Sequence, residues 1–266
     1  MDHQMRRCLR FTGLCFLLSA TLLITNRINQ QNQTKQLTQQ LQEVANQTKK
    51  EEGTPLYINP PQNLEDPYWD YIAIPFLEVD FTELQRQNSD TVAWIQVPNT
   101  NIDYPVVQTS NNTYYLNHAF DHAINDAGWI FSDFRNNLQY PNNNTVIYGH
   151  GRIEGTMFGS LKNTLTKDWY DNQNNHIIQL STPTANTLWQ IFSIYTIDAE
   201  SYYITTHFKN DEEYNTFLKT ITNRSQYKFN TSINTMDKII TLSTCQNDYG
   251  KRIVVHAKLI KKETRS

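Results

Sequence analysis

The sequence predicts a mainly β domain, either a barrel or a sandwich, with helices at its periphery. Many short segments are rich in β-branched and aromatic residues and are separated by turn residues. Helical patterns are few, and the clearest lies at residues 210–225. Many short strands with few helices are typical of closed or packed sheets, and the sequence contains no internal repeat.

Local residue patterns predict the individual helices and strands. Residues 79–88 predict a short helix that opens the domain, and residues 111–120 predict one or two helical turns. In residues 210–225, Asn210 can cap the helix, acidic residues fill its first turn, and apolar residues form one face. Strands are expected at 91–98, 101–108, 127–133, 144–150, 176–182, 186–197, 237–245 and 252–260.

The N-terminus predicts export. Three arginines, the last of them Arg10, precede the apolar residues 11–25, and polar sequence follows from Asn26. This is the pattern of a signal peptide or a signal anchor. The apolar run is short for a span, so cleavage is an alternative, but no small-x-small cleavage site follows and Arg10 can snorkel. We expect residues 1–25 to be a single-pass anchor in the cell membrane, with the rest of the chain extracellular.

Two further regions follow the anchor. Residues 26–63 are Gln/Asn-rich and then Pro-containing, which predicts a stalk and a linker. Leu37, Leu41 and Val44 form a helical stripe that is too thin for a core, so a frayed helix is expected there. Residues 64–266 form the folded domain.

The composition limits the possible functions. At 266 residues with 38% hydrophobic residues, the chain can bury one sizeable core or two small ones. A net charge of −3 provides no basic field for phosphate groups, so we expect no binding to nucleic acid.

Cys245 is the only cysteine after position 15. In an oxidising compartment a single cysteine indicates intermolecular pairing or a reactive thiol, and a buried small hydrophobe is the alternative. Cys245 ends one predicted strand, and after six residues Arg252 begins the next. A hairpin of that length places both residues at one end of the sheet. A guanidinium in that position favours the thiolate and can hold an oxyanion.

A nucleophilic thiol needs a proton partner, which is most often a histidine. His150 is the best candidate among the seven, because it ends the predicted strand 144–150 and has a glycine on either side. An ordinary loop histidine is the alternative. His256 falls inside a predicted strand, where a packed or surface side chain is expected.

These residues together resemble the sortase signature. "TLSTC" ends at Cys245, an arginine begins the next strand, and "YGH" ends at His150. The similarity continues in "VAWIQVPNTNIDYPVVQ", "YYLNHAFD", "GWIFSDFRN", "VIYGHGRIEGTMFGSL" and "VVHAKLI", so residues 80–260 resemble class B sortases. The resemblance implies an eight-stranded sortase barrel with N-terminal helices and an extra helix before the cysteine strand. It also implies a cysteine transpeptidase at the outer face of a Gram-positive membrane.

The resemblance also implies roles for individual residues. Cys245 is the expected nucleophile, His150 the general acid and base, and Arg252 the group that binds the substrate backbone and the oxyanion. The residues expected to line the substrate site are Leu116, Tyr203, Ile204, Ser243 and Thr244. No acidic cluster like the calcium site of some class A relatives is visible, so we expect neither a metal nor a cofactor.

The implied reaction is acyl transfer. The thiolate attacks a threonine carbonyl in the C-terminal sorting motif of a surface protein or pilin, and an amine then takes the acyl group from the enzyme. The default acceptor is the peptidoglycan cross-bridge, and the alternative is a pilin lysine. Anchoring is preferred because the aromatic stretch 63–76 is expected to pack on the barrel and not to form a mobile lid. A non-catalytic surface or pilus-associated protein is the alternative of a different class.

Overall fold

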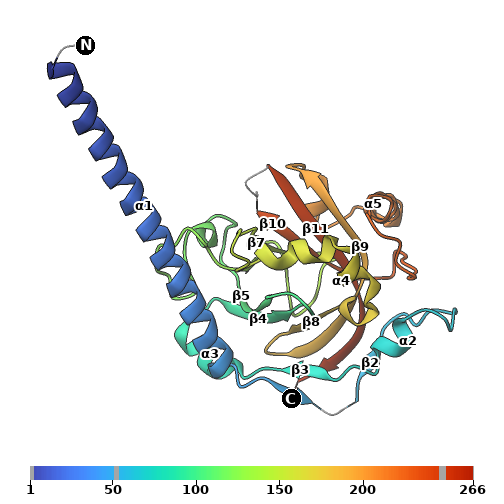
Figure 1. Ribbon diagram of the computed structural model, residues 1–266. Coiled ribbons are helices and arrows are strands. Elements are labelled where there is room, and N and C mark those ends of the chain that lie inside the picture. The colour runs from blue at the N-terminus through green and yellow to red at the C-terminus, as the bar shows by residue number, and fades with distance from the viewer. Residues whose placement is uncertain (1–2, 51–53, 246–249, 266) are drawn as a thin grey trace.

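The computed structural model describes residues 3–50, 54–245 and 250–265, and it describes the backbone alone at 3–14, Lys50 and Cys245. A β-barrel forms its body, and one long helix projects from the barrel (Figure 1). Within the described residues no helix is both long enough and apolar enough to cross a membrane.

Nine described strands form one sheet in the order β10-β7-β6-β5-β4-β8-β9-β11-β2. β10 also pairs with β11, which closes the first eight strands into a barrel, while β2 lies outside it. The predicted eight-stranded barrel is therefore confirmed. The strands are β2 (Leu56–Tyr57), β4 (Thr91–Gln96), β5 (Asp103–Val107), β6 (Phe131–Ser132), β7 (Asn144–His150), β8 (Ile177–Ser181), β9 (Ala185–Asp198), β10 (Ile239–Cys245) and β11 (Lys251–Thr264).

Short helices lie around this barrel. α3 begins after Asp80, whose carboxylate accepts the Thr82 N–H at 2.8 Å, and α5 begins after Asn210, which accepts the Glu213 N–H at 2.9 Å. The apolar face of α5 is buried against the outer side of β9, β10 and β11, which places the predicted extra helix behind the cysteine strand. The short helices are α2 (Tyr68–Tyr71), α3 (Phe81–Gln87), α4 (Lys167–Asp171), α5 (Asp211–Asn223) and the 3-10 turns η1 (Tyr114–Leu116), η2 (Gly159–Leu165), η3 (Gln173–Asn175) and η4 (Tyr202–Ile204).

The long helix α1 (His3–Val44) differs from the frayed stalk that the sequence predicts. Its last turns pack on the barrel, where Leu41 and Ala45 are fully buried in the main hydrophobic cluster. Thr34 accepts a hydrogen bond from Asn125 at 3.0 Å, which adds a polar contact to the same interface. The narrow apolar stripe of α1 is sufficient to hold the helix on the barrel, because it covers a core that the barrel already forms.

The aromatic stretch 63–76 packs against the barrel as expected. Tyr68, Tyr71 and Phe76 are buried with residues of β8, β9 and β11. The Tyr71 hydroxyl donates to the Gln173 carbonyl at 2.8 Å, which fixes this cover to the loop before β8. β3 (Phe76–Glu78) follows and pairs with β1 (Thr48–Lys50), so the linker also contains regular structure that the sequence does not predict.

Candidate active site

Three strand ends meet at one end of the barrel. β7 and β10 are parallel and in register, and their last pair is His150 with Cys245. β11 is antiparallel to β10 on its other side, with Ser243 opposite Val254. Cys245 lies two residues after Ser243, and Arg252 lies two residues before Val254. The three predicted catalytic residues therefore converge, although the Cys245 side chain and residues 246–249 of the predicted turn lie outside the described part of the chain.

His150 is held by the loop that carries η1. Its Nε2 lies 2.7 Å from the Leu116 carbonyl oxygen, which can only accept, so Nε2 carries the hydrogen and Nδ1 is free to accept a proton. Burial lowers the pKa of the His150 imidazole below its ordinary value, with Arg152 acting in the same direction against the raising effect of the Leu116 contact. The ring is therefore mainly neutral at pH 7.

Two glycines allow this close packing. A Cβ on Gly149 would lie 2.8 Å from the Phe158 ring, which packs under the end of β7. A Cβ on Gly128, where φ is +57°, would lie 2.4 Å from the Tyr115 carbonyl oxygen and 3.0 Å from Cδ2 of His150. The Leu116 carbonyl can thus reach the imidazole only because residue 128 has no side chain.

Arg252 is positioned by buried hydroxyl groups. One of its terminal nitrogens donates to the Tyr203 hydroxyl at 3.0 Å, and that hydroxyl lies 3.0 Å from Oγ of Ser243. Its Nε is buried and has no hydrogen-bond partner among the described atoms. A guanidinium N–H that lines a cavity without a partner is available to a carbonyl oxygen or an oxyanion.

A cavity of about 420 Å³ opens at this end of the barrel. Of the predicted substrate residues, Leu116, Ile204, Ser243 and Thr244 line it, whereas Tyr203 is fully buried and acts behind it through Arg252. The Thr244 hydroxyl already accepts the Ile253 N–H at 2.8 Å, so it stabilises the β10–β11 hairpin. The complete lining is Asn112, Leu116, Phe131, Tyr148, His150, Ile204, Ser243, Thr244 and Arg252.

Comparison with known proteins identifies the family. The family model for the sortase domain matches residues 95–260. The chain is 36% identical over 186 residues to sortase B of Listeria monocytogenes, covering 69% of this chain and 75% of the relative. It is 38% identical over 184 residues to sortase B of Staphylococcus aureus, covering 68% and 75%. The chain belongs to the sortase family.

Solved structures agree with this assignment. Sortase B from Bacillus anthracis in complex with AAEK1 matches with a TM-score of 0.71 and 32% identity, over 88% of this chain and 99% of that one. A Staphylococcus aureus sortase B–substrate complex matches with a TM-score of 0.64 and 38% identity, over 68% and 84%. A sortase B complexed with triglycine has the same TM-score and identity, over 68% and 85%. This sortase is thus a cysteine transpeptidase of the sortase B type.

Behind the cavity of this sortase, Asp133 connects several of its walls. Its fully buried carboxylate accepts hydrogen bonds from Tyr148 Oη and Asn112 Nδ2, each at 2.9 Å, and from Arg135 at 2.7 and 2.8 Å. Arg135 also donates to the Ile204 carbonyl at 3.0 Å. Burial alone would raise the pKa of Asp133, but hydrogen bonds from Arg135 and Tyr148 outweigh it and hold that pKa below its ordinary value. One carboxylate therefore orients three parts of the cavity wall.

A second buried network holds η4. The Thr241 hydroxyl donates to the Asn144 side-chain oxygen at 2.6 Å, so it accepts from His256 Nδ1 at 2.8 Å. His256 Nε2 then accepts from the Tyr195 hydroxyl at 2.9 Å. Asn144 Nδ2 donates to the Tyr203 carbonyl at 3.1 Å, at the turn that carries Ile204.

The sequence patterns do not identify four residues of this site: Asn112, Phe131, Tyr148 and Asp133. Tyr148 precedes His150 by two residues in β7, so its position on the same strand face is the one signal that could have identified it. The described residues contain no group of three or more His, Cys, Asp or Glu side chains arranged to hold a metal ion.

Proposed function

We propose that this sortase is a membrane-anchored, extracellular enzyme that cleaves a C-terminal sorting motif at a threonine carbonyl and transfers the acyl group to an amine. The observation that carries the proposal is the in-register pairing of His150 with Cys245 at the strand ends, next to Arg252 and a cavity of about 420 Å³. A nucleophile, a base and a cationic donor at one cavity are the groups that acyl transfer requires.

The first half of the reaction acylates Cys245. His150 accepts the thiol proton at Nδ1, since Nε2 remains bonded to the Leu116 carbonyl. The sulfur attacks the threonine carbonyl carbon, the C–N bond breaks, and the imidazolium returns its proton to the leaving amine. The second half reverses this order: an acceptor amine attacks the thioester, His150 takes its proton, and the thiol is released.

Arg252 stabilises the charge that develops on the carbonyl oxygen. Tyr203 holds one nitrogen of the guanidinium, and the Nε–H has no partner among the described atoms. The oxyanion that forms on attack can accept this hydrogen bond in a partly buried site, where such contacts are stronger than in water.

The cavity favours an extended peptide with an apolar side chain. Leu116, Phe131, Tyr148 and Ile204 supply its apolar surface, and Asn112 supplies an amide that can bond to a peptide backbone. The similarity to a chain solved as a sortase B–substrate complex supports the same cavity as the substrate site here.

The peptidoglycan cross-bridge is our preferred acceptor, with a pilin lysine as the alternative. A related sortase B was solved with triglycine, which carries a free amine on a small flexible peptide. The stretch 63–76 is packed against the barrel through Tyr68 and Tyr71, so it is not available as the mobile lid that would favour pilin polymerisation.

The extracellular location rests on the N-terminal pattern. Arginines precede the apolar residues 11–25, and α1 continues without a break from that region to the barrel. We propose that this helix holds the catalytic domain close to the outer surface of the membrane, where cell-wall precursors are assembled.

The test supplies the full-length protein with a panel of sorting peptides and two kinds of amine. Triglycine and a lysine-bearing pilin domain compete for the thioester, and mass spectrometry identifies the products. We expect transfer to triglycine. Ladders of linked pilin with no transfer to triglycine would replace anchoring by polymerisation, and cleavage of no peptide at all would overturn the assigned chemistry.

A further inference from the structure

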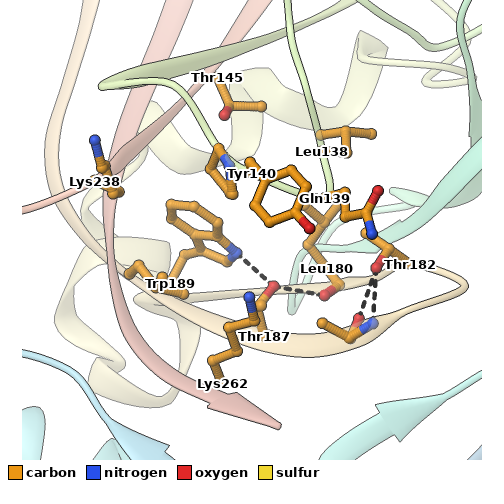
Figure 2. Close-up of a pocket in the computed structure, with 13 residues that line it drawn as sticks. Leu138, Gln139, Tyr140, Thr145, Leu180, Thr182, Thr187, Trp189, Lys238 and Lys262 are labelled. Atoms are coloured by element: carbon orange, nitrogen blue, oxygen red, sulfur yellow. Dashed lines mark hydrogen bonds between the residues drawn. The ribbon is translucent and has the colours of Figure 1, made fainter. Parts of the chain in front are cut away.

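A second cavity lies at the opposite end of the barrel from His150. It has a volume of about 200 Å³, and its lining includes Thr145 at the start of β7, Lys238 just before β10 and Leu259 of β11. Figure 2 shows Leu180 and Trp189 on its walls, with Leu138 and Tyr140 of the β6–β7 loop closing one side. The cavity is thus the far end of the barrel interior, covered by one loop.

One buried polar atom of this cavity has no partner. The Oγ1 atom of Thr145 is inaccessible to solvent, and no described residue forms a hydrogen bond with it. Two neighbouring polar groups of the wall are paired: Trp189 Nε1 donates to Thr187 Oγ1 at 2.8 Å, which donates to the Leu180 carbonyl at 2.6 Å. An unpaired buried hydroxyl is costly, so the Thr145 hydroxyl adds no stability to this wall in the free protein.

The charge at this cavity is positive. Lys238 and Lys262 line it and are half-buried, and neither ammonium group has a hydrogen bond or ion pair within the described chain. None of the described lining residues is acidic. In Figure 2 the Lys262 amine lies beside Thr187 and faces the cavity. Two unpaired cations next to an apolar wall are complementary to an anion with an apolar body.

We propose that the non-catalytic end of the barrel binds a small aromatic carboxylate. Eight-stranded barrels have interiors that are either filled by side chains or hold one small ligand. A cavity of about 150 Å³ is known to accommodate benzene, so the volume here accepts a six-membered ring with little space to spare. The ring lies against Trp189 and Leu259, and the carboxylate accepts a hydrogen bond from Lys262.

An entry route exists beside Tyr140. This side chain is 71% exposed and stands at the rim of the cavity, so it can swing aside without disturbing the barrel core. The loop stays attached through Asn142, whose Nδ2 donates to the Arg135 carbonyl at 3.1 Å. The site needs no catalytic residue, so this proposal is independent of the function proposed above.

The test titrates benzoate into the full-length protein and follows the indole N–H resonance of Trp189 by NMR. Benzamide has the same shape without the charge and serves as the ligand control. We expect a saturable shift with benzoate and binding of benzamide weaker by roughly tenfold or more, since hydrogen bonds to charged groups have about that effect. No saturable shift with benzoate, or equal binding of both compounds, would overturn the proposal.

Variants assign the contacts. Lys262→Met should weaken benzoate binding by roughly tenfold, and Lys219→Met, on the exposed face of α5, should leave it unchanged. Thr145→Val should leave benzoate binding unchanged, and the free protein should melt no lower than the wild type, because a methyl replaces an unpaired buried hydroxyl. If Lys262→Met binds benzoate like the wild type, the cavity is not its site.

Discussion

Replacing Asp133 by asparagine should loosen the substrate cavity without touching the reacting atoms. The Asp133 carboxylate is fully buried and accepts hydrogen bonds from Tyr148, Asn112 and Arg135. In Asp133→Asn one oxygen becomes an NH₂ group that faces these donors. Arg135 remains close to a group that no longer carries its counter-charge.

The expected loss in the free energy of unfolding follows from the contacts that Asp133→Asn removes. Hydrogen bonds to a charged group each contribute about 1.5–3 kcal/mol, and breaking a buried ion pair costs about 3–5 kcal/mol. The Arg135 side chain is 38% exposed and can be hydrated, which favours the lower end, roughly 3 kcal/mol. The pKa of Asp133 is held low in the folded state. The stability that its ionised carboxylate contributes is therefore complete above about pH 4, and it is lost as the pH falls through the folded-state pKa.

The assay combines denaturant unfolding with steady-state kinetics on a sorting peptide. We expect Asp133→Asn to raise KM more than it lowers kcat, because Asn112 and Tyr148 line the proposed substrate cavity while Cys245 and His150 are unchanged. Glu200→Gln is the matched control, since its ion pair with Arg224 is exposed and should contribute less than about 1 kcal/mol. An Asp133→Asn variant that unfolds like Glu200→Gln and retains the wild-type KM would refute this reasoning.

Three further predictions concern the charged groups of the site and of the core. Arg252→Lys keeps the charge but loses the Nε donor and the contact with Tyr203, so kcat/KM should fall by roughly 100-fold, and near-normal kinetics would exclude an oxyanion role. The pH dependence of kcat/KM should be bell-shaped with an acid midpoint below about 6.5, because the pKa of His150 is lowered; a flat profile contradicts coupled titration with the thiol. Burial lowers the pKa of His256 to about 3. As the pH falls, this histidine is therefore protonated in the unfolded state before it is protonated in the folded state. The stability that neutral His256 provides is then complete above about pH 6.5 and decreases by up to about 1.4 kcal/mol per pH unit towards pH 3, and an unchanged slope in His256→Gln would refute this.

The sequence predicts the ends of β7 and β10 because strand termination is local. A run of β-branched residues followed by glycine or by a polar turn marks the end of a strand, so His150 and Cys245 are identified with their elements. The register between the two strands is not local. It depends on which strands are neighbours in the closed barrel, and here the resemblance to sortases supplies what the pattern cannot.

The residues that support the cavity are not predictable from spacing. Asp133 contacts Asn112, Tyr148 and Arg135, which come from three separate segments, and the Ile204 carbonyl joins them through Arg135. A buried aspartate and a loop aspartate have the same letter in the sequence. Only the fold shows that this one is enclosed and surrounded by donors.

The environments of Tyr203 and of α1 are also not predictable from the sequence pattern alone. The resemblance places Tyr203 in the groove wall, but the side chain points into the barrel wall and acts through Arg252. The apolar stripe at Leu37, Leu41 and Val44 is correct as a pattern, yet its partner surface includes α3 and β5, which lie far later in the chain. Tertiary contacts decide what a short apolar stripe becomes.

The most direct test of the central claim is intact-mass spectrometry of the enzyme mixed with a sorting peptide in the absence of an acceptor amine. The wild type should gain the mass of the cleaved peptide, and hydroxylamine should remove it, because a thioester reacts readily with amines. Cys245→Ala should show no adduct and no transfer while it melts like the wild type, since the change removes only one small side chain. An adduct on Cys245→Ala, or transfer of the peptide by that variant, would contradict the assignment of Cys245 as the nucleophile.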